Sequence, residues 1–467
     1  MVRSRGTSSR WLAAAIAALT AACSSAPGSG TGDDGGTPPG SDAPPPTGLF
    51  PLGASSTGGY LVTADGHPFL LHGEAAWSLI VQLTTADTMQ YLADRHRRGV
   101  NAILVNLIEG LYSDHPPSNA TGDAPFSTQD DFSTPGEAYF AHADQVIDLA
   151  AGQGMAVLLF PSYLGKMAQE GWRDQMSAMG ATAGAPKCAA YGRYLGQRYA
   201  GKHNIVWMWG GDFMPSTGSS LETCMKAISD GILANAPARP AFRTSAHWSM
   251  ESSSWDEQAF RSSIDAVGVY TYNPALPMCR TARMQTAMPT YLVEGCYEND
   301  MYGRCPAISD VRRQQWWSML GCGAGEIYGV EGIWQFGSTW SQQLGSPVSV
   351  GEQQLNAIVQ QVAWQTLALD DALVTVGRGT PGMVDEVAAA RTADHRQALI
   401  YIPPNGSAQI TVALSQMSGP VTATWQDPTA DHSIAAGDGL TGSHVFTIPS
   451  GTNAGGDTDW ALVLTAP

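Results

Sequence analysis

This sequence contains few charged residues, and few basic residues in particular. Asp, Glu, Lys and Arg make up 14% of the 467 residues, and the 41 acidic residues outnumber the 24 basic ones, for a net charge of −17. Such a surface repels the phosphate backbone of nucleic acids and the anionic head groups of lipids. We therefore expect no nucleic-acid partner, and no membrane contact that depends on surface charge.

Metal-binding motifs are also missing. The sequence has no Cys-x-x-Cys pair, no Cys/His ligand spacing and no His-Glu-x-x-His. A structural zinc site and a zinc protease are therefore not indicated. We expect neither a metal ion nor an organic cofactor.

No apolar run is long enough to span a bilayer. The apolar segment 11–22 follows Arg3, Arg5 and Arg10 and ends directly before Cys23. This pattern is typical of an export signal and resembles a bacterial lipoprotein signal, although Thr20 stands where that signal usually has Leu. We expect residues 1–23 to be a lipoprotein-type signal peptide.

The same segment predicts the location of the protein. Lipidation of Cys23 would anchor the exported chain at the bacterial cell surface or outer membrane, and this would be its only membrane contact. The alternative is an ordinary cleaved signal and a secreted protein. Residues 24–48 are rich in Ser, Gly and Pro and read as a flexible linker.

Six cysteines remain when Cys23 is set apart. An even number in an exported protein predicts disulfides. The sequence does not choose among the 15 possible full pairings of Cys188, Cys224, Cys279, Cys296, Cys305 and Cys322.

Short apolar strands alternate with helical segments over residues 49–372. We expect helices near 84–99, 137–153, 186–202, 221–236, 309–320 and 351–369, and eight strands near 69–73, 102–107, 156–160, 205–209, 242–246, 266–270, 290–293 and 329–335. This number of units predicts an α/β fold, a (β/α)8 TIM barrel. Residues 373–467 read instead as short alternating strands separated by Gly, Asn, Asp and Pro, which predicts an all-β sandwich domain.

Polar and aromatic residues stand at the ends of the expected barrel strands. Because strand ends converge on one face of a barrel, these residues should line one pocket. We expect a substrate-binding role for Glu74, Trp77, Asn106, Glu109, Tyr163, His247, Trp248, Tyr272, Glu298, Trp334 and Gln335.

Asp212 and Glu294 are the two carboxylates best placed for catalysis. Asp212 follows strand 205–209 through Gly210 and Gly211, and Glu294 ends strand 290–293, across the barrel. A carboxyl pair at facing strand ends suits glycoside hydrolysis, and the surrounding aromatic rings suit stacking against sugars. Capping of a turn by Asp212, or a structural ion pair of Glu294, is the plainer interpretation.

Several motifs resemble the apiosidase-like glycoside hydrolases. They are His72-Gly-Glu-Ala-Ala-Trp-Ser-Leu79, Asn204-Ile-Val-Trp-Met-Trp-Gly-Gly-Asp212 and Glu294-Gly-Cys-Tyr-Glu298. The C-terminal segment resembles the β domain, historically labelled collagen-binding, that usually follows. The resemblance implies a retaining hydrolase with Asp212 as acid/base and Glu294 as nucleophile, acting on a plant or microbial cell-wall polysaccharide such as the apiose-bearing side chains of pectin.

The motifs also depart from the family. Glu74, Phe213 and Gly295 stand where the family usually has Asp, a polar residue and Pro. These changes lie near the expected pocket, so the substrate can differ from apiosides. The alternative function is a non-catalytic surface protein that binds glycans or matrix and needs the aromatic pocket but not the acid pair.

Overall fold

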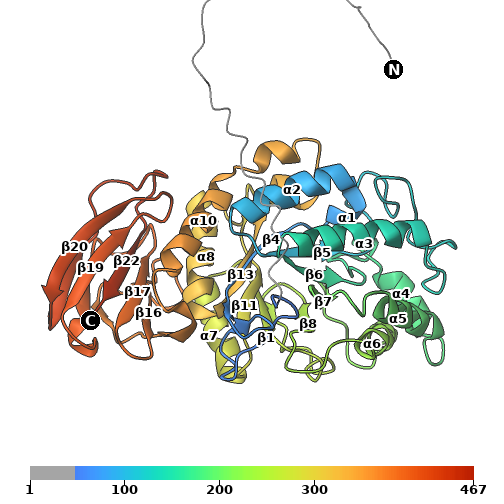
Figure 1. Ribbon diagram of the computed structural model, residues 1–467, viewed down its shortest axis with the longest axis horizontal. Coiled ribbons are helices and arrows are strands. Elements are labelled where there is room, and N and C mark those ends of the chain that lie inside the picture. The colour runs from blue at the N-terminus through green and yellow to red at the C-terminus, as the bar shows by residue number, and fades with distance from the viewer. Residues whose placement is uncertain (1–47) are drawn as a thin grey trace, which may run out of the picture. The chain divides into compact units, whose positions relative to one another are not determined.

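The computed structural model describes residues 48–467, and its centre is a barrel (Figure 1). The order of parallel strands is β8-β7-β6-β5-β4-β13-β11-β10, so the first strand, β4, pairs with the last, β13. The predicted (β/α)8 barrel is confirmed. Its strands are β4 (Leu71–Ala75), β5 (Ala102–Asn106), β6 (Ala156–Phe160), β7 (Ile205–Gly210), β8 (Thr244–His247), β10 (Val267–Tyr270), β11 (Thr290–Glu294) and β13 (Gly323–Val330).

Helices surround the strands. Thr84 caps α2 by accepting a hydrogen bond from the backbone of Asp87 (3.2 Å), as its sequence position predicts. The helices are α1 (Leu79–Gln82), α2 (Thr85–Arg97), α3 (Glu137–Gly152), α4 (Arg173–Gly180), α5 (Pro186–Arg198), α6 (Ser220–Leu233), α7 (Ala275–Gln285), α8 (Ile308–Gly321), α9 (Glu331–Trp334) and α10 (Pro347–Val359). A small antiparallel sheet precedes them and consists of β1 (Gly53–Ala54), β2 (Leu61–Val62) and β3 (Pro68–Phe69).

The last barrel strand lies earlier in the chain than the expected 329–335. Gly323 and Gly325 both have positive φ, and a Cβ on Gly325 would lie 2.0 Å from the carbonyl oxygen of Leu71. The sequence did not predict a strand at β13, because glycines and a charged residue such as Glu326 are uncommon in strands. Residues 331–334, expected in the strand, form α9 instead. The helix expected over 351–369 ends at Val359, and residues 367–369 form a strand.

The barrel has one seam without a strand ladder. No pairing joins β8 to β10 in the described residues 48–467. Ser254, just after the short strand β9 (Ser252–Ser253), bridges the gap: its Oγ donates to the carbonyl of Ala246 (2.6 Å) and accepts from the backbone of Gly268 (2.8 Å). A single backbone hydrogen bond, from the N–H of Asp265 to the carbonyl of Thr244, joins the two strand segments directly.

The C-terminal strands form the predicted β sandwich. A six-stranded antiparallel sheet has the order β14-β16-β17-β22-β19-β20, and a three-stranded sheet has the order β15-β18-β21. The first strand, β14, precedes the expected domain start at residue 373. The strands are β14 (Leu367–Leu369), β15 (Val374–Val376), β16 (Ala388–Thr392), β17 (Gln397–Ile402), β18 (Gln409–Ala413), β19 (Val421–Gln426), β20 (Ser433–Leu440), β21 (Ser443–Thr447) and β22 (Trp460–Thr465).

Helix α8 packs between the barrel and the six-stranded sheet (Figure 1). Every residue from Val311 to Gly321 is buried. Trp316 stacks on Tyr401 of β17 with ring centroids 5.1 Å apart, and Arg312 makes a two-pronged ion pair with Asp459 (2.7 Å to each oxygen). The barrel and the β domain therefore share one continuous core.

Three disulfides use all six cysteines of residues 48–467: Cys188–Cys224, Cys279–Cys322 and Cys296–Cys305. Disulfides of this number are typical of exported proteins. Within residues 48–467, no helix is long and apolar enough to cross a membrane. The expected signal peptide with Cys23 lies outside the described residues, as does nearly all of the linker, so both remain predictions.

Candidate active site

Three consecutive left-handed residues carry the chain from β7 into the site. Gly210, Gly211 and Asp212 have φ values of 92°, 95° and 60°. A Cβ on Gly210 would lie 2.3 Å from the carbonyl oxygen of His247, and one on Gly211 would lie 2.3 Å from the Tyr163 ring. The two glycines are thus required for close packing, and a strained conformation at Asp212 is typical of functional positions.

Two tyrosines hold the Asp212 carboxyl. Tyr163 donates to Oδ2 (2.5 Å) and Tyr270 to Oδ1 (2.6 Å). Burial raises the pKa of Asp212, and the nearby charge of Glu294 raises it further. Asp212 therefore keeps its proton to a higher pH than a free aspartic acid does.

Glu294 is the last residue of β11 and accepts two hydrogen bonds. Tyr272 donates to Oε1 (2.9 Å) and Tyr297 donates to Oε2 (3.2 Å). Trp77 in turn donates to the Tyr297 hydroxyl (2.9 Å), which fixes the orientation of that hydroxyl.

His247, the last residue of β8, lies between the two carboxyl residues. The backbone N–H of Asp212 donates to Nδ1 (3.1 Å), and Nε2 lies 3.3 Å from Oε2 of Glu294. Because Nδ1 accepts a hydrogen bond, the proton of the neutral ring belongs on Nε2, facing Glu294. One oxygen of Asp212, one oxygen of Glu294 and one nitrogen of His247 all lie within 4.8 Å of one another.

These groups open into a pocket of about 890 Å³, including its mouth. Of the residues predicted from the sequence, the pocket is lined by Asp212, Glu294, Trp77, Asn106, Tyr163, Tyr272, Trp334 and Gln335. The side-chain amide of Asn106 is buried and has no partner in residues 48–467, so it can serve a ligand hydroxyl.

Glu74 does not reach this pocket, contrary to the prediction. It lies within β4 rather than after it, so the alternation of side chains turns it outward, away from the inward-facing Leu71 and Ala75. Its carboxylate lies 2.7 Å from Nε of Arg95 and accepts from the Tyr91 hydroxyl (2.6 Å). Glu74 holds helix α2 against the barrel.

Three further residues expected at the site also lie outside this pocket. Trp248 packs outside the barrel and donates to the Ser254 carbonyl (3.1 Å). Glu298 accepts from the backbone of Val348 (3.0 Å) and so caps the start of α10. Glu109 is fully buried and accepts from Ser78 Oγ (2.6 Å). None of the three lines the pocket, and His247 contacts the two carboxyl residues from behind its wall.

The sequence interpretation missed much of the pocket wall. The additional lining residues are Tyr112, Lys166, Glu170, Tyr270, Tyr297, Met301, Tyr302, Arg304 and Glu331. Tyr270 ends a barrel strand and Tyr297 follows Glu294 by three residues, so strand-end position alone was a signal for both. Met301, Tyr302 and Arg304 carry no such signal, because a loop closed by a disulfide brings them to the pocket.

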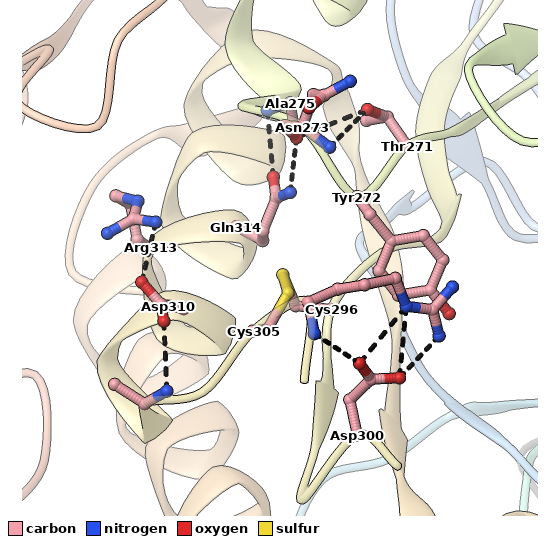
Figure 2. The surroundings of a disulfide bond; sticks show 12 residues. Thr271, Tyr272, Asn273, Ala275, Cys296, Asp300, Cys305, Asp310, Arg313 and Gln314 are labelled. Atoms are coloured by element: carbon pink, nitrogen blue, oxygen red, sulfur yellow. Dashed lines mark hydrogen bonds and ion pairs between the residues drawn. A yellow bond between two sulfur atoms is a disulfide. The ribbon is translucent and has the colours of Figure 1, made fainter. Parts of the chain in front are cut away.

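This loop runs from Cys296 to Cys305 (Figure 2). Asp300 accepts hydrogen bonds from the backbone and side chain of Arg304 (2.5–3.2 Å), and the Arg304 guanidinium lies over the Tyr272 ring. The disulfide and this ion pair together fix the loop beside the tyrosine that donates to Glu294.

The model of the apiosidase-like catalytic domain matches residues 55–371. The chain belongs to the apiosidase-like family. It is therefore a glycoside hydrolase, and its substrate is a carbohydrate. No curated protein matches it.

Solved structures support the fold of this apiosidase-like protein. A glycoside hydrolase family 5 protein from Bacteroides vulgatus is 20% identical with a TM-score of 0.74, over 89% of this chain and 93% of the other. A second structure, described as a glycoside hydrolase, is 21% identical with a TM-score of 0.72, over 89% and 96% of the two chains. Both matches extend well beyond the catalytic domain.

Proposed function

We propose that this protein is a retaining glycoside hydrolase of cell-wall polysaccharides, with apiose-bearing pectic side chains as one substrate to test. The observation that supports retention is the separation of the two carboxyls, whose nearest oxygens lie within 4.8 Å. Retaining enzymes hold their carboxyl groups about 5–5.5 Å apart, whereas inverting enzymes need about 6.5–9.5 Å to admit a water molecule.

The environments of the two carboxyls favour one assignment of roles. Glu294, which accepts from two tyrosines, attacks the anomeric carbon as a carboxylate. Asp212, whose pKa is raised, gives its proton to the departing glycosidic oxygen. In the second step the Asp212 carboxylate takes a proton from water, the resulting oxygen attacks the anomeric carbon, and the ester to Glu294 breaks.

A screen of plant and microbial polysaccharides with identification of the products tests the activity. NMR of the anomer first released tests retention. Asp212→Asn and Glu294→Gln should each abolish turnover, and Asn tolerates the left-handed backbone at position 212. Asp230→Asn on the exposed face of α6 is the matched control and should leave turnover unchanged.

The alternative is a surface protein that binds glycans or matrix without cleaving them. Binding that survives both catalytic substitutions, with no hydrolysis of any polysaccharide, would replace the hydrolase proposal. Export with a lipid on Cys23 belongs to either proposal, and mass spectrometry of the mature N-terminus tests it.

A further inference from the structure

A second polar cluster lies behind the barrel wall, outside the active-site pocket. His72 comes from β4, Glu326 from β13, Gln315 from α8 and Glu352 from α10. The four side chains are 98–99% buried. One ring nitrogen of His72 and one carboxylate oxygen from each glutamate lie within 4.8 Å of one another.

The hydrogen bonds within this cluster leave several atoms unsatisfied. His72 Nδ1 pairs with Oε1 of Glu352, and Gln315 Nε2 donates to its Oε2 (2.9 Å). Both oxygens of Glu326, Nε2 of His72 and Oε1 of Gln315 have no hydrogen-bond partner within residues 48–467. Buried polar atoms are normally paired, so this many orphaned atoms at one place indicates a ligand.

The cluster also has an excess of negative charge. In the described part of the chain, no Lys or Arg forms an ion pair with Glu326 or Glu352, and His72 is the one basic side chain paired with either of them. Two buried carboxylates with only one imidazole beside them, and no Lys or Arg, are strongly unfavourable.

We propose that His72, Glu326 and Glu352 bind one divalent first-row transition-metal ion. A divalent cation neutralises two carboxylates and provides a partner for the free oxygens of Glu326. A single proton on Glu326 would serve only one of those oxygens and would leave the other without a partner. One imidazole nitrogen with carboxylate oxygens suits Zn²⁺ or Mn²⁺, whereas Ca²⁺ prefers oxygen ligands alone.

The position of the cluster gives the ion a structural role. β4 and β13 are the first and last strands of the barrel and pair with each other, with His72 opposite Glu326 in the register. An ion held by both strands and by α10 would fasten the closure of the barrel. This inference is independent of the proposed catalytic reaction.

Anomalous diffraction locates the ion directly. Crystals of the purified protein soaked in Zn²⁺, and others soaked in Mn²⁺, should show an anomalous peak with ligand distances of about 2.0–2.2 Å to His72 and Glu326. No peak there for either metal would overturn the proposal. A peak only at the other donor cluster, Asp212, His247 and Glu294, would also overturn it.

Metal content and thermal unfolding test the same site in solution. The purified protein incubated with Zn²⁺ and then desalted should retain about one ion per chain. Glu326→Gln should lose this ion, and Glu294→Gln, which disables the other donor cluster, should retain it. Dipicolinate should lower the Tm of the wild type, and added Zn²⁺ should restore it. An unchanged metal content in Glu326→Gln contradicts the proposal; if that variant does not fold, the anomalous peak decides.

Discussion

The guanidinium of Arg304 lies 3.5 Å from the centre of the Tyr272 ring, and the hydroxyl of that ring donates to Glu294. Burial raises the pKa of Tyr272, and the positive charge of Arg304 opposes that rise. The cation therefore makes the hydroxyl a better hydrogen-bond donor to the proposed nucleophile.

Replacing Arg304 should slow catalysis through Tyr272. Removal of a cation–π contact worth about 0.5–2 kcal/mol predicts that Arg304→Met lowers kcat about 2- to 30-fold. Steady-state kinetics on a substrate from the polysaccharide screen measures this change. Arg261→Met, which removes a cation–π contact with Trp255 outside the pocket, is the control and should leave kcat near the wild-type value. A raised KM with unchanged kcat would mean that Arg304 only binds substrate.

Azide should separate the roles of the two carboxyls. The substrate is an aryl glycoside whose leaving group departs without a proton. Asp212→Gly, which suits the left-handed backbone, then removes the base that activates water but leaves Glu294 able to form the ester. Azide should then restore turnover and give a glycosyl azide with the configuration of the substrate. In Glu294→Gly the azide attacks directly and should give the opposite configuration. NMR of the products decides, and exchanged configurations would reverse the two assignments.

Glu109 should make stability depend on pH. Burial raises its pKa from 4.5 to about 7, so the folded protein binds this proton more tightly than the unfolded chain does. Its stabilising contribution is complete below pH 4.5 and is lost as pH rises through 7, a change of up to about 3 kcal/mol. Glu109→Gln should therefore flatten the fall in urea midpoint between pH 5 and pH 8. The exposed Glu137→Gln should keep the wild-type slope, and an equal flattening there would reject the prediction.

The buried ion pair between Arg312 and Asp459 should contribute more to the free energy of unfolding than ion pairs on the surface do. Arg312→Met leaves the Asp459 carboxylate buried without its arginine, which costs about 3–5 kcal/mol. The pair of half-buried Lys202 and exposed Asp148 offers a matched control, and Lys202→Met should cost less than about 1 kcal/mol. Urea unfolding compares the two variants. Equal losses would show that the barrel and the β domain are not held by this contact.

The sequence was most informative where one periodicity dominated. Alternating strands and helices predicted the barrel, and the ends of β7 and β11 brought Asp212 and Glu294 together. Prediction failed where tertiary contacts overrode local preference. Gly325 is a glycine because the Leu71 backbone lies against it, which hid β13. A shift of β4 by two residues, from the expected 69–73 to Leu71–Ala75, kept Glu74 inside the strand and on its outer face.

The position of the loop between Cys296 and Cys305 at the pocket could not be predicted from the sequence. Arg304 reaches the pocket because Cys296 pairs with Cys305, and six cysteines alone do not reveal that pairing. His247 was expected to touch the sugar directly. Its contact with both carboxyl residues depends on the turn at Gly210, which no periodicity encodes.

The Ser254 bridge has a consequence for motion. Local opening requires the least free energy where few backbone hydrogen bonds must break, and β8 and β10 share no ladder. Amide hydrogens along this seam should therefore exchange faster than those of β5 and β6. His247 and Tyr270 end the two strands of the seam, and both contact Asp212. Local opening between β8 and β10 would thus displace the proposed proton donor, Asp212. Glu294 would stay in position, because its strand, β11, is hydrogen-bonded to both neighbouring strands.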